Sequence, residues 1–411
     1  MMNIQYLQSS LSMKTENNTR KKRLLIVNDL GISRGGTQKR VSQLIKGLIA
    51  SNIFEEIFVV AHVDARIHTK KIPEHVFCVY STKEKIRSDI KTLIQEKNIS
   101  HVQVHNLALL STEPIKVAKE MSLPVIFFAH DYWPICGRRS FYAYNKKICL
   151  EPKCISCNLC IGPLSYFHLK TKIQSHINMC DVGIATSNYM IDTYEKAGIL
   201  KEKWEKLTPW IREEYLQKRI QKRYSFGKQK KILYVGTLDK EKGFFDLLNV
   251  FVEMCKKRKD LLLIAIGDVS QRNIQRIQDI LIKENITPYV SMPGYIENGS
   301  ELLHYYLNAD LYVFPSLLNE SFGQTWVQAL ACGTPIVAYD SGSVKEFLKE
   351  YGMLITLGDK EQLNKVISSF FNDPFIQSQA KEKARFGKKY AQSHFSLKKS
   401  FNSIKEIYNQ F

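Results

Sequence analysis

The sequence contains no apolar run long enough to cross a lipid bilayer. A spanning helix needs roughly 20 consecutive apolar residues, whereas runs such as LLLIAIG have only the length of a strand. The N-terminal stretch MMNIQYLQSSLSMKTENNTRKKR also lacks the order of a secretory signal, in which basic residues precede an apolar segment. We therefore expect a cytoplasmic protein. Residues 1–22 have the composition of a disordered N-terminal segment.

The chain is strongly basic, yet it has no arginine-rich tract and no recognisable nucleic-acid-binding motif. Lys and Arg number 59 against 40 Asp and Glu, which gives a formal net charge of +19. Such a charge favours anionic partners, although a genome-wide bias towards Lys, Asn and Ile explains it equally well. We expect no nucleic-acid partner, and we expect peripheral attachment to an anionic membrane, at its inner face.

The two halves of the chain repeat one pattern. Residues 21–49 and 230–255 each give an apolar strand, a glycine-containing turn and an amphipathic helix. Each copy begins a series of short apolar strands that alternate with helices, which is typical of a parallel sheet covered on both faces. A chain of 411 residues also suits two domains of roughly 200 residues. We predict an α/β protein of two doubly wound Rossmann-like domains that face a central cleft, where the ligand binds.

Six strands are expected in each half. In the first half they are LLIVN, IFVVAH, FCVY, HVQVH, PVIFFAH and DVGIATS, and in the second KILYVG, LLLIAIG, YVSMPG, DLYVFPS, PIVAY and GMLITL. The predicted units are a first domain at 23–207 with a cysteine-rich insertion at 136–160, a linker at 208–230, a second domain at 231–379, and helices at 380–411 that pack across the junction.

A polar stripe interrupts an otherwise apolar helix in the second half. In NESFGQTWVQALACGTPIVA, the side chains of Glu320, Gln324 and Gln328 recur at intervals of four. Ser321 and Gln324 have the spacing of a capping box, which predicts a helix that starts at Ser321 and Phe322. An unsatisfied buried polar group costs roughly 1 to 3 kcal/mol, so the stripe requires partners.

Two interpretations of the stripe remain open. In the simpler one, Gln324 caps the helix, Gln328 bonds a neighbouring loop and Glu320 is solvated at a strand end. In the other, the stripe faces a ligand, because the N–H groups of Phe322 and Gly323 at the helix start point outwards and can bind an anion. A ligand that combines hydroxyl groups with phosphate satisfies both features, and sugar nucleotides are such ligands.

The same segment resembles the E-x7-E region of retaining glycosyltransferases of GT-B family 4, and the resemblance extends from about Arg23 to Tyr408. RGGTQKRV is similar to the first glycine loop of that family, FFAHDYWP to its histidine segment and YVGTLDKEKG to its phosphate loop. The resemblance implies a UDP- or GDP-sugar donor held mainly by the second domain. It also implies a glycan or lipid-linked acceptor whose hydroxyl is held mainly by the first domain.

The resemblance also assigns residues. His130, Lys242 and Glu320 are the implied catalytic residues: His130 reaches the reacting centre, Lys242 neutralises the diphosphate, and Glu320 holds sugar hydroxyls. The implied donor-binding residues are Gly35, Gly36, Thr237, Gly294, Tyr295, Phe322, Gly323, Gln324 and Gln328. The simpler alternatives are a structurally satisfied histidine at a strand end, a solvated lysine with Lys240 as its rival for the phosphate, and a plain glycine turn.

Two positions depart from the family pattern. Thr237 stands where the phosphate loop usually carries Arg, which removes one cation, and Lys240 is a candidate substitute. Gln328 replaces the second Glu of the motif. A carboxylate accepts hydrogen bonds from two ribose hydroxyls, whereas an amide has one accepting oxygen and a donating nitrogen. No Asp-x-Asp pair occurs in the expected cleft segments, and a lysine with a helix N-terminus can replace a divalent metal. We therefore expect no cofactor for catalysis.

A cysteine-rich loop follows the histidine segment. Cys149, Cys154, Cys157 and Cys160 have C-x4-C-x2-C-x2-C spacing, which suits a structural zinc ion. An iron–sulfur cluster, a loop without an ion and a disulfide formed on oxidation are the alternatives. The resemblance implies a structural role for this loop in shaping the acceptor pocket, because related transferases often carry a cysteine-bearing insertion after their histidine segment.

The expected function is transfer of a hexosyl-type sugar, with retention, in the biosynthesis of a surface polysaccharide or a lipid-linked glycan. Two alternatives belong to other classes. A non-catalytic GT-B partner subunit is consistent with the departures at Thr237 and Gln328, and a GT-B sugar-nucleotide epimerase isomerises its donor without an acceptor.

Overall fold

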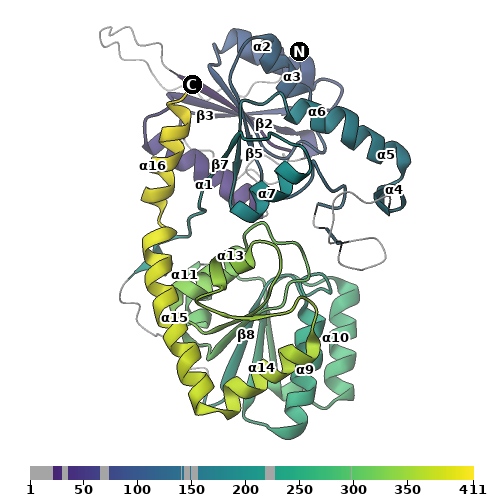
Figure 1. The fold of residues 1–411 in the computed structure, drawn as a ribbon, viewed down its shortest axis with the longest axis vertical. Coiled ribbons are helices and arrows are strands. Elements are labelled where there is room, and N and C mark those ends of the chain that lie inside the picture. The colour runs from purple at the N-terminus through teal and green to yellow at the C-terminus, as the bar shows by residue number, and fades with distance from the viewer. Residues whose placement is uncertain are drawn as a thin grey trace.

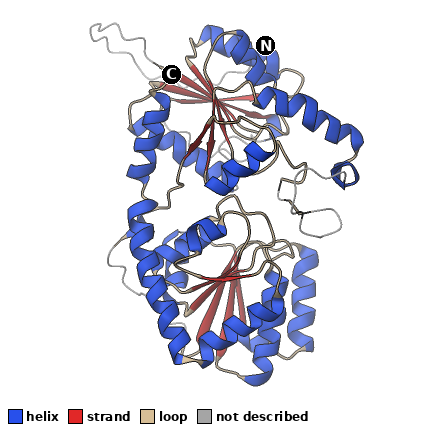
Figure 2. Ribbon diagram, in the orientation of Figure 1, coloured by secondary structure: helices blue, strands red, loops and turns tan. Residues whose placement is uncertain are grey.

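The computed structural model describes residues 22–29, 36–64, 74–139, 141–142, 149, 156–217, 227–297 and 299–411. The chain forms two α/β domains, one above the other in the view of Figure 1, each with helices around a central sheet (Figure 2). The first sheet has the order β3-β2-β1-β4-β5-β6-β7 and the second β10-β9-β8-β11-β12-β13. Every strand pair in both sheets is parallel.

All six strands predicted for the first half are present, and the structure adds a seventh. The strands are β1 (Arg23–Val27), β2 (Glu56–His62), β3 (Val76–Ser81), β4 (His101–Val104), β5 (Val125–Phe128), β6 (Val182–Ala185) and β7 (Trp204–Lys206). The helices are α1 (Gly36–Ala50), α2 (Ile86–Glu96), α3 (Glu113–Glu120), α4 (Ser156–Ile161), α5 (Pro163–His168), a π-helical turn (Leu169–Ile173), α6 (Gln174–Ile177), α7 (Asn188–Lys196) and α8 (Glu213–Leu216).

The six strands predicted for the second half are also confirmed. They are β8 (Lys230–Val235), β9 (Leu261–Ile266), β10 (Val290–Gly294), β11 (Leu311–Phe314), β12 (Ile336–Tyr339) and β13 (Met353–Ile355). The helices are α9 (Phe244–Lys257), α10 (Gln271–Lys283), a 3-10 turn (Thr287–Tyr289), α11 (Gly299–Asn308), α12 (Gln324–Cys332), α13 (Val344–Leu348), α14 (Lys360–Asn372), α15 (Pro374–His394) and α16 (Leu397–Tyr408).

Strand β1 shows why the apolar runs become central strands. Its residues Leu24 to Val27 are completely buried, and β1 pairs with β2 on one side and β4 on the other. Because helices cover both faces of a parallel sheet, such a strand is apolar along its whole length rather than alternating. The carboxyl ends of the central strands consequently carry the first polar residues, and these ends face the other domain.

The last two helices connect the domains. Helix α15 runs along the second domain and α16 continues onto the first (Figure 1). Ile404, Ile407 and Tyr408 of α16 belong to the same apolar cluster as β1 and α1, and the Ser400 hydroxyl donates to the Thr208 carbonyl at 2.7 Å. Within the described ranges, no helix is both long and apolar enough to cross a membrane.

Candidate active site between the two domains

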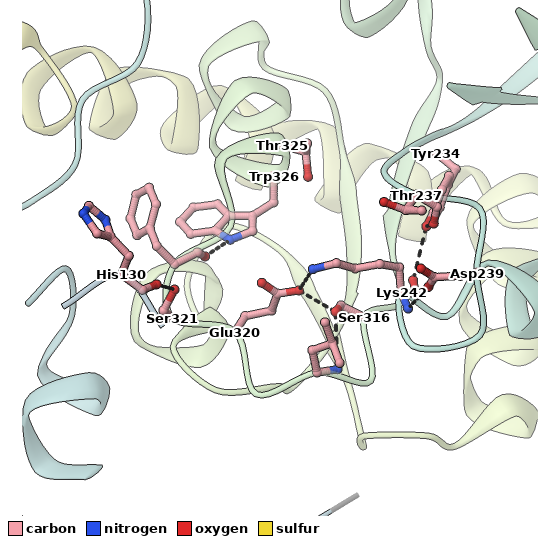
Figure 3. A network of polar contacts seen from close by, with 12 residues as sticks. His130, Tyr234, Thr237, Asp239, Lys242, Ser316, Glu320, Ser321, Thr325 and Trp326 are labelled. Atoms are coloured by element: carbon pink, nitrogen blue, oxygen red, sulfur yellow. Dashed lines mark hydrogen bonds and ion pairs between the residues drawn. The ribbon is translucent and has the colours of Figure 1, made fainter. Parts of the chain in front are cut away.

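Two loops of the second domain bring Lys242 and Glu320 together. The loop after β8 carries Lys242, and the loop after β11 carries Glu320. The Lys242 Nζ lies 2.8 Å from Glu320 Oε1, and the Ser316 hydroxyl donates to the same oxygen (Figure 3). The two residues predicted to act together from distant parts of the sequence therefore share one contact.

The loop after β8 is held by its own hydrogen bonds. The Lys242 amide donates to Asp239 Oδ1 at 2.7 Å, and the Tyr234 hydroxyl donates to the Thr237 carbonyl at 2.6 Å. Gly243 ends the loop at a φ of +71°, and a Cβ there would lie 1.6 Å from the Pro315 carbonyl oxygen. Glycine is therefore required at this position, and it lets this loop pack directly against the chain that follows β11.

The predicted start of helix α12 is wrong. The helix begins at Gln324, its N-cap residue Gly323 has a φ of +92°, and no side chain caps it. The left-handed backbone at Gly323 breaks the helical path before it can reach Ser321. The Ser321 hydroxyl donates instead to the His130 carbonyl at 2.8 Å, in the other domain. Gln324 is thus the first helical residue and not part of a capping box.

The backbone at the start of α12 has the features of an anion site. Trp326 Nε1 donates to the Phe322 carbonyl, and a Cβ on Gly323 would lie 2.5 Å from that nitrogen. Within the described part of the chain, the amides of Phe322 and Gly323 donate to no backbone carbonyl. Two amide donors at a helix N-terminus, with Lys242 nearby, form a suitable cradle for a phosphate group.

Gln328 has a protein partner. Its Oε1 accepts a hydrogen bond from the Tyr306 hydroxyl at 3.2 Å, so the partner lies in helix α11 and not in a neighbouring loop, as the simpler interpretation had it. An amide keeps further hydrogen-bonding capacity, since its nitrogen donates two bonds. Contact between Gln328 and a ribose stays a prediction.

His130 reaches the site from the first domain. The residue is 8% exposed, and its backbone carbonyl accepts the hydrogen bond from Ser321 of the second domain. Burial lowers the pKa of His130 well below its usual value, and the neighbouring His105 and Arg40 lower it further. The imidazole is therefore neutral at physiological pH.

Arg40 is a site residue that the sequence analysis missed. It lies one turn into α1, with its Cζ 5.4 Å from the centre of the Phe322 ring. Burial lowers the pKa of Arg40 to about 10, while the charge of Glu320 opposes that shift. The signal available in the sequence was a cation about one helical turn beyond the glycine pair Gly35 and Gly36.

The structure places four of the other predicted site residues next to the end of a strand or at the start of a helix. Gly294 ends β10 at a φ of +82°, and Tyr295 beside it is half-exposed. Thr237 is exposed on the loop after β8. Gly36 is the first residue of α1, and Gly35 lies outside the described residues.

The cysteine loop is described only in part. Cys154 lies outside the described residues, whereas Cys149, Cys157 and Cys160 are half-buried. Among the residues that the structure describes, no group of three or more His, Cys, Asp or Glu side chains is placed to hold a metal ion. The structural zinc ion stays a prediction.

Further contacts hold the two domains together. The hydroxyls of Thr186 and Ser187 both donate to the Ser321 carbonyl at 3.1 Å. The Glu346 carboxylate of α13 accepts from the amides of Asn188 and Tyr189 at 3.1 Å, which places a negative charge at the N-terminus of α7.

A cavity of about 710 Å³ lies between α7 and α13, next to these contacts. Its lining includes Tyr189 and Asp192 from the first domain and Asp340 and Phe347 from the second. Gly342 also lines it, and a Cβ there would lie 2.3 Å from the Glu320 carbonyl oxygen. The cavity therefore borders the backbone that carries Glu320, and its size suits a small-molecule site.

Residues 217–392, which include Lys242 and Glu320, match the family model described as glycosyl transferases group 1. This segment is a glycosyl transferases group 1 domain. Over 364 residues the chain is 28% identical to an uncharacterised 41.2 kDa protein in the cps region of Klebsiella pneumoniae, covering 83% of this chain and 93% of that protein. It is also 25% identical over 181 residues to the capsular polysaccharide biosynthesis glycosyltransferase CapM of Staphylococcus aureus, which is 43% of this chain and 45% of CapM.

Solved structures confirm the predicted fold class. A sucrose-phosphate synthase from Thermosynechococcus elongatus superposes with a TM-score of 0.69 at 16% identity, covering 95% of this chain and 99% of that one. Anabaena HepE in complex with UDP gives a TM-score of 0.69 at 14% identity, over 95% of this chain and 100% of HepE. The chain thus has the GT-B arrangement of two Rossmann-like domains.

Buried histidines predict acid sensitivity. Burial lowers the pKa of His101 from 6.5 to about 4, so between these values the unfolded chain binds more protons than the folded one. The free energy of unfolding should therefore fall as pH drops below 6.5. Replacing His101 with Asn should reduce this slope by up to about 1.4 kcal/mol per pH unit, measured by urea unfolding between pH 7.5 and pH 4.5. An equal slope in wild type and variant would contradict the buried, neutral state of His101.

Proposed function

We propose that the chain is a retaining GT-B family 4 glycosyltransferase that moves a hexosyl-type sugar from a UDP- or GDP-sugar to a glycan or lipid-linked acceptor. The observation that carries the proposal is the 2.8 Å contact of Lys242 with Glu320 beside the amides of Phe322 and Gly323, which donate to no backbone carbonyl among the described residues. Cation, carboxylate and amides together provide a partner for each part of a glycosyl diphosphate. The similarity to CapM and the UDP bound in the structure of HepE support a nucleotide-sugar donor.

The proposed chemistry uses charges that are already in place. The acceptor oxygen bonds to the anomeric carbon as the bond from that carbon to the phosphate oxygen breaks, and the acceptor proton passes to the departing diphosphate. Lys242 and the two amides stabilise the negative charge that grows on the phosphate. Glu320 exchanges its contact with Lys242 for hydroxyl groups of the sugar.

Arg40 compensates for the missing cation at Thr237. The guanidinium of Arg40 faces the same loop as Lys242, since it lies over the Phe322 ring and interacts with the charge of Glu320. Arginine binds phosphate oxygens with two parallel hydrogen bonds. The first domain thereby supplies one of the phosphate-binding cations.

The acceptor enters the cavity between α7 and α13. Aromatic rings such as those of Tyr189 and Phe347 offer flat apolar surfaces to sugar rings, and the carboxylates of Asp192 and Asp340 accept hydrogen bonds from hydroxyls. The biological context is the assembly of a surface polysaccharide or a lipid-linked glycan, which the relative in a cps region supports.

Replacing Lys242 with Met and Glu320 with Gln should each lower kcat for nucleoside diphosphate release by about 100-fold, because each variant removes stabilisation of the transition state. The assay uses a panel of UDP- and GDP-sugars with oligosaccharide and lipid-linked acceptors. Lys256→Met is the matched control, since Lys256 is an exposed lysine of α9 that pairs only with Glu253 among the described residues.

Unchanged rates in both site variants would refute the site. Donor isomerised without acceptor would instead identify an epimerase, and wild type without turnover on any donor would favour a partner subunit.

Replacing Tyr189 with Ala should raise the acceptor KM about tenfold while hydrolysis of the donor alone stays unchanged. The side chain of Tyr189 lines the cavity and is 37% exposed, whereas its contact with Glu346 uses only the backbone amide. Phe375→Ala is the control, because that ring is exposed on α15 and is not among the residues that line the cavity. An unchanged acceptor KM would place the acceptor elsewhere and leave the donor site standing.

We also propose peripheral association with an anionic membrane, on the basis of the net charge of +19. The protein should cosediment with phosphatidylglycerol vesicles at low salt and dissociate as salt approaches about 1 M, where the screening length falls to roughly 3 Å. Phosphatidylcholine vesicles are the control. Absence of binding at low salt, or equal binding to both lipids, would contradict an electrostatic attachment.

A further inference from the structure

A chain of buried hydrogen bonds connects the C-terminal helix to His130. The Tyr408 hydroxyl of α16 bonds to Gln103 Oε1 on β4. Gln103 Nε2 lies 2.8 Å from His105 Nε2, and His105 Nδ1 lies 2.7 Å from His130 Nε2. All four side chains are buried, with Gln103 and His105 completely inaccessible to solvent. Four polar groups in the core of the first domain thus lead to the candidate active site.

The direction of these bonds fixes the protons on both imidazoles. A phenol hydroxyl donates to the amide oxygen that faces it, and the amide nitrogen of Gln103 can only donate, so His105 Nε2 must accept. The proton of neutral His105 therefore sits on Nδ1, from which it is donated to His130 Nε2. Since His130 Nε2 accepts, the proton of neutral His130 sits on Nδ1.

We propose that Tyr408, Gln103 and His105 act as positioning residues that make His130 a fixed hydrogen-bond donor, with its Nδ1–H directed to an oxygen of the bound ligand. His130 is then neither a general base nor a cation in the reaction. This role rests on the proposed function only for the identity of the ligand, because the position of the proton is a property of the protein alone.

The surroundings of His130 favour the same role. Its ring is stacked on Phe128 with centres 4.8 Å apart, and it lies edge to edge with His105, whose centre is 4.9 Å away, as their hydrogen bond requires. Its carbonyl is held by Ser321 of the second domain. Nδ1 is buried and has no hydrogen-bond partner within the described part of the protein. A buried donor without a partner is costly, and a ligand oxygen would remove that cost.

The involvement of α16 gives the C-terminal helix a role beyond packing. Tyr408 meets Phe54 and His101 edge to face, with ring centres 4.9 Å and 6.1 Å away, which holds the hydroxyl towards Gln103. Helix α16, which connects the second domain to the first, therefore also orients the hydroxyl proton of Tyr408. The position of the proton on His130 consequently depends on the packing of α16 against the first domain.

Nuclear magnetic resonance tests the proton positions directly. In full-length protein labelled with 15N in its histidine rings, two-bond and three-bond correlations distinguish Nδ1–H from Nε2–H in each neutral imidazole. His130 and His105 are assigned from the signals lost in His130→Asn and His105→Asn. Nδ1–H is expected for both in wild type. Nε2–H on His130 in wild type would overturn the proposal without any assay of activity.

Gln103→Glu is the decisive variant. It keeps the shape of the side chain and reverses the donor and acceptor roles in the hydrogen bonds from residue 103 to His105 and from His105 to His130. A carboxylate accepts from His105 Nε2–H, so His105 Nδ1 must accept and His130 must carry its proton on Nε2. Both histidines should therefore change tautomer, and kcat/KM for transfer should fall about tenfold, which is the effect of losing one neutral hydrogen bond. Tyr408→Phe should leave Gln103 free to turn and give a mixture of both tautomers.

The matched control is Tyr339→Phe, which removes a buried hydroxyl that bonds to Asp246 in the second domain. It should leave both tautomers unchanged. If Gln103→Glu left the His130 tautomer unchanged, the chain would not set it, and the proposal would fail whether or not the variant were active. If the tautomers changed as expected while wild type transferred no sugar, only the proposed function would fail. If they changed with undiminished transfer, the role of the Nδ1 proton would be refuted.

Discussion

The contacts of Ser321 are the constraint on which the candidate site depends. Its hydroxyl donates to the His130 carbonyl, and its own carbonyl accepts from Thr186 and Ser187. One residue of the second domain thus uses both polar groups to bind two loops of the first. Because Glu320 precedes Ser321 and Phe322 follows it, the position of the carboxylate and of the amide cradle relative to His130 follows from these bonds.

The charged side chains around Glu320 determine what the site can bind. Glu320 carries the negative charge between Lys242 of its own domain and Arg40 of the other, and a neutral histidine completes the surroundings. Cations and amide donors at the start of α12 are already oriented before any phosphate arrives, so they need little reorganisation when charge develops. The site thereby matches the needs of a leaving diphosphate.

The sequence predicted the strands well because each central strand is apolar on both faces, which leaves an unambiguous run. It missed β7, whose three residues WEK lie at a sheet edge and contain a single apolar side chain. It also misplaced the start of α12, because the serine that matched a capping pattern bonds to the other domain. Local pattern rules consider only nearby partners, whereas 191 positions separate Ser321 from His130.

The sequence by itself determined the fold class, the strands and the residue types at the cleft, since these follow from apolar periodicity and from short motifs at strand ends. Only the tertiary structure decided which of these residues meet. The bond of Gln328 to Tyr306 and the hydrogen bonds from Tyr408 to His130 join residues from separate elements. The burial of Arg40 likewise requires contacts with other elements. Their properties arise from desolvation and from the direction of hydrogen bonds, and both exist only once the two domains and the last helix have packed together.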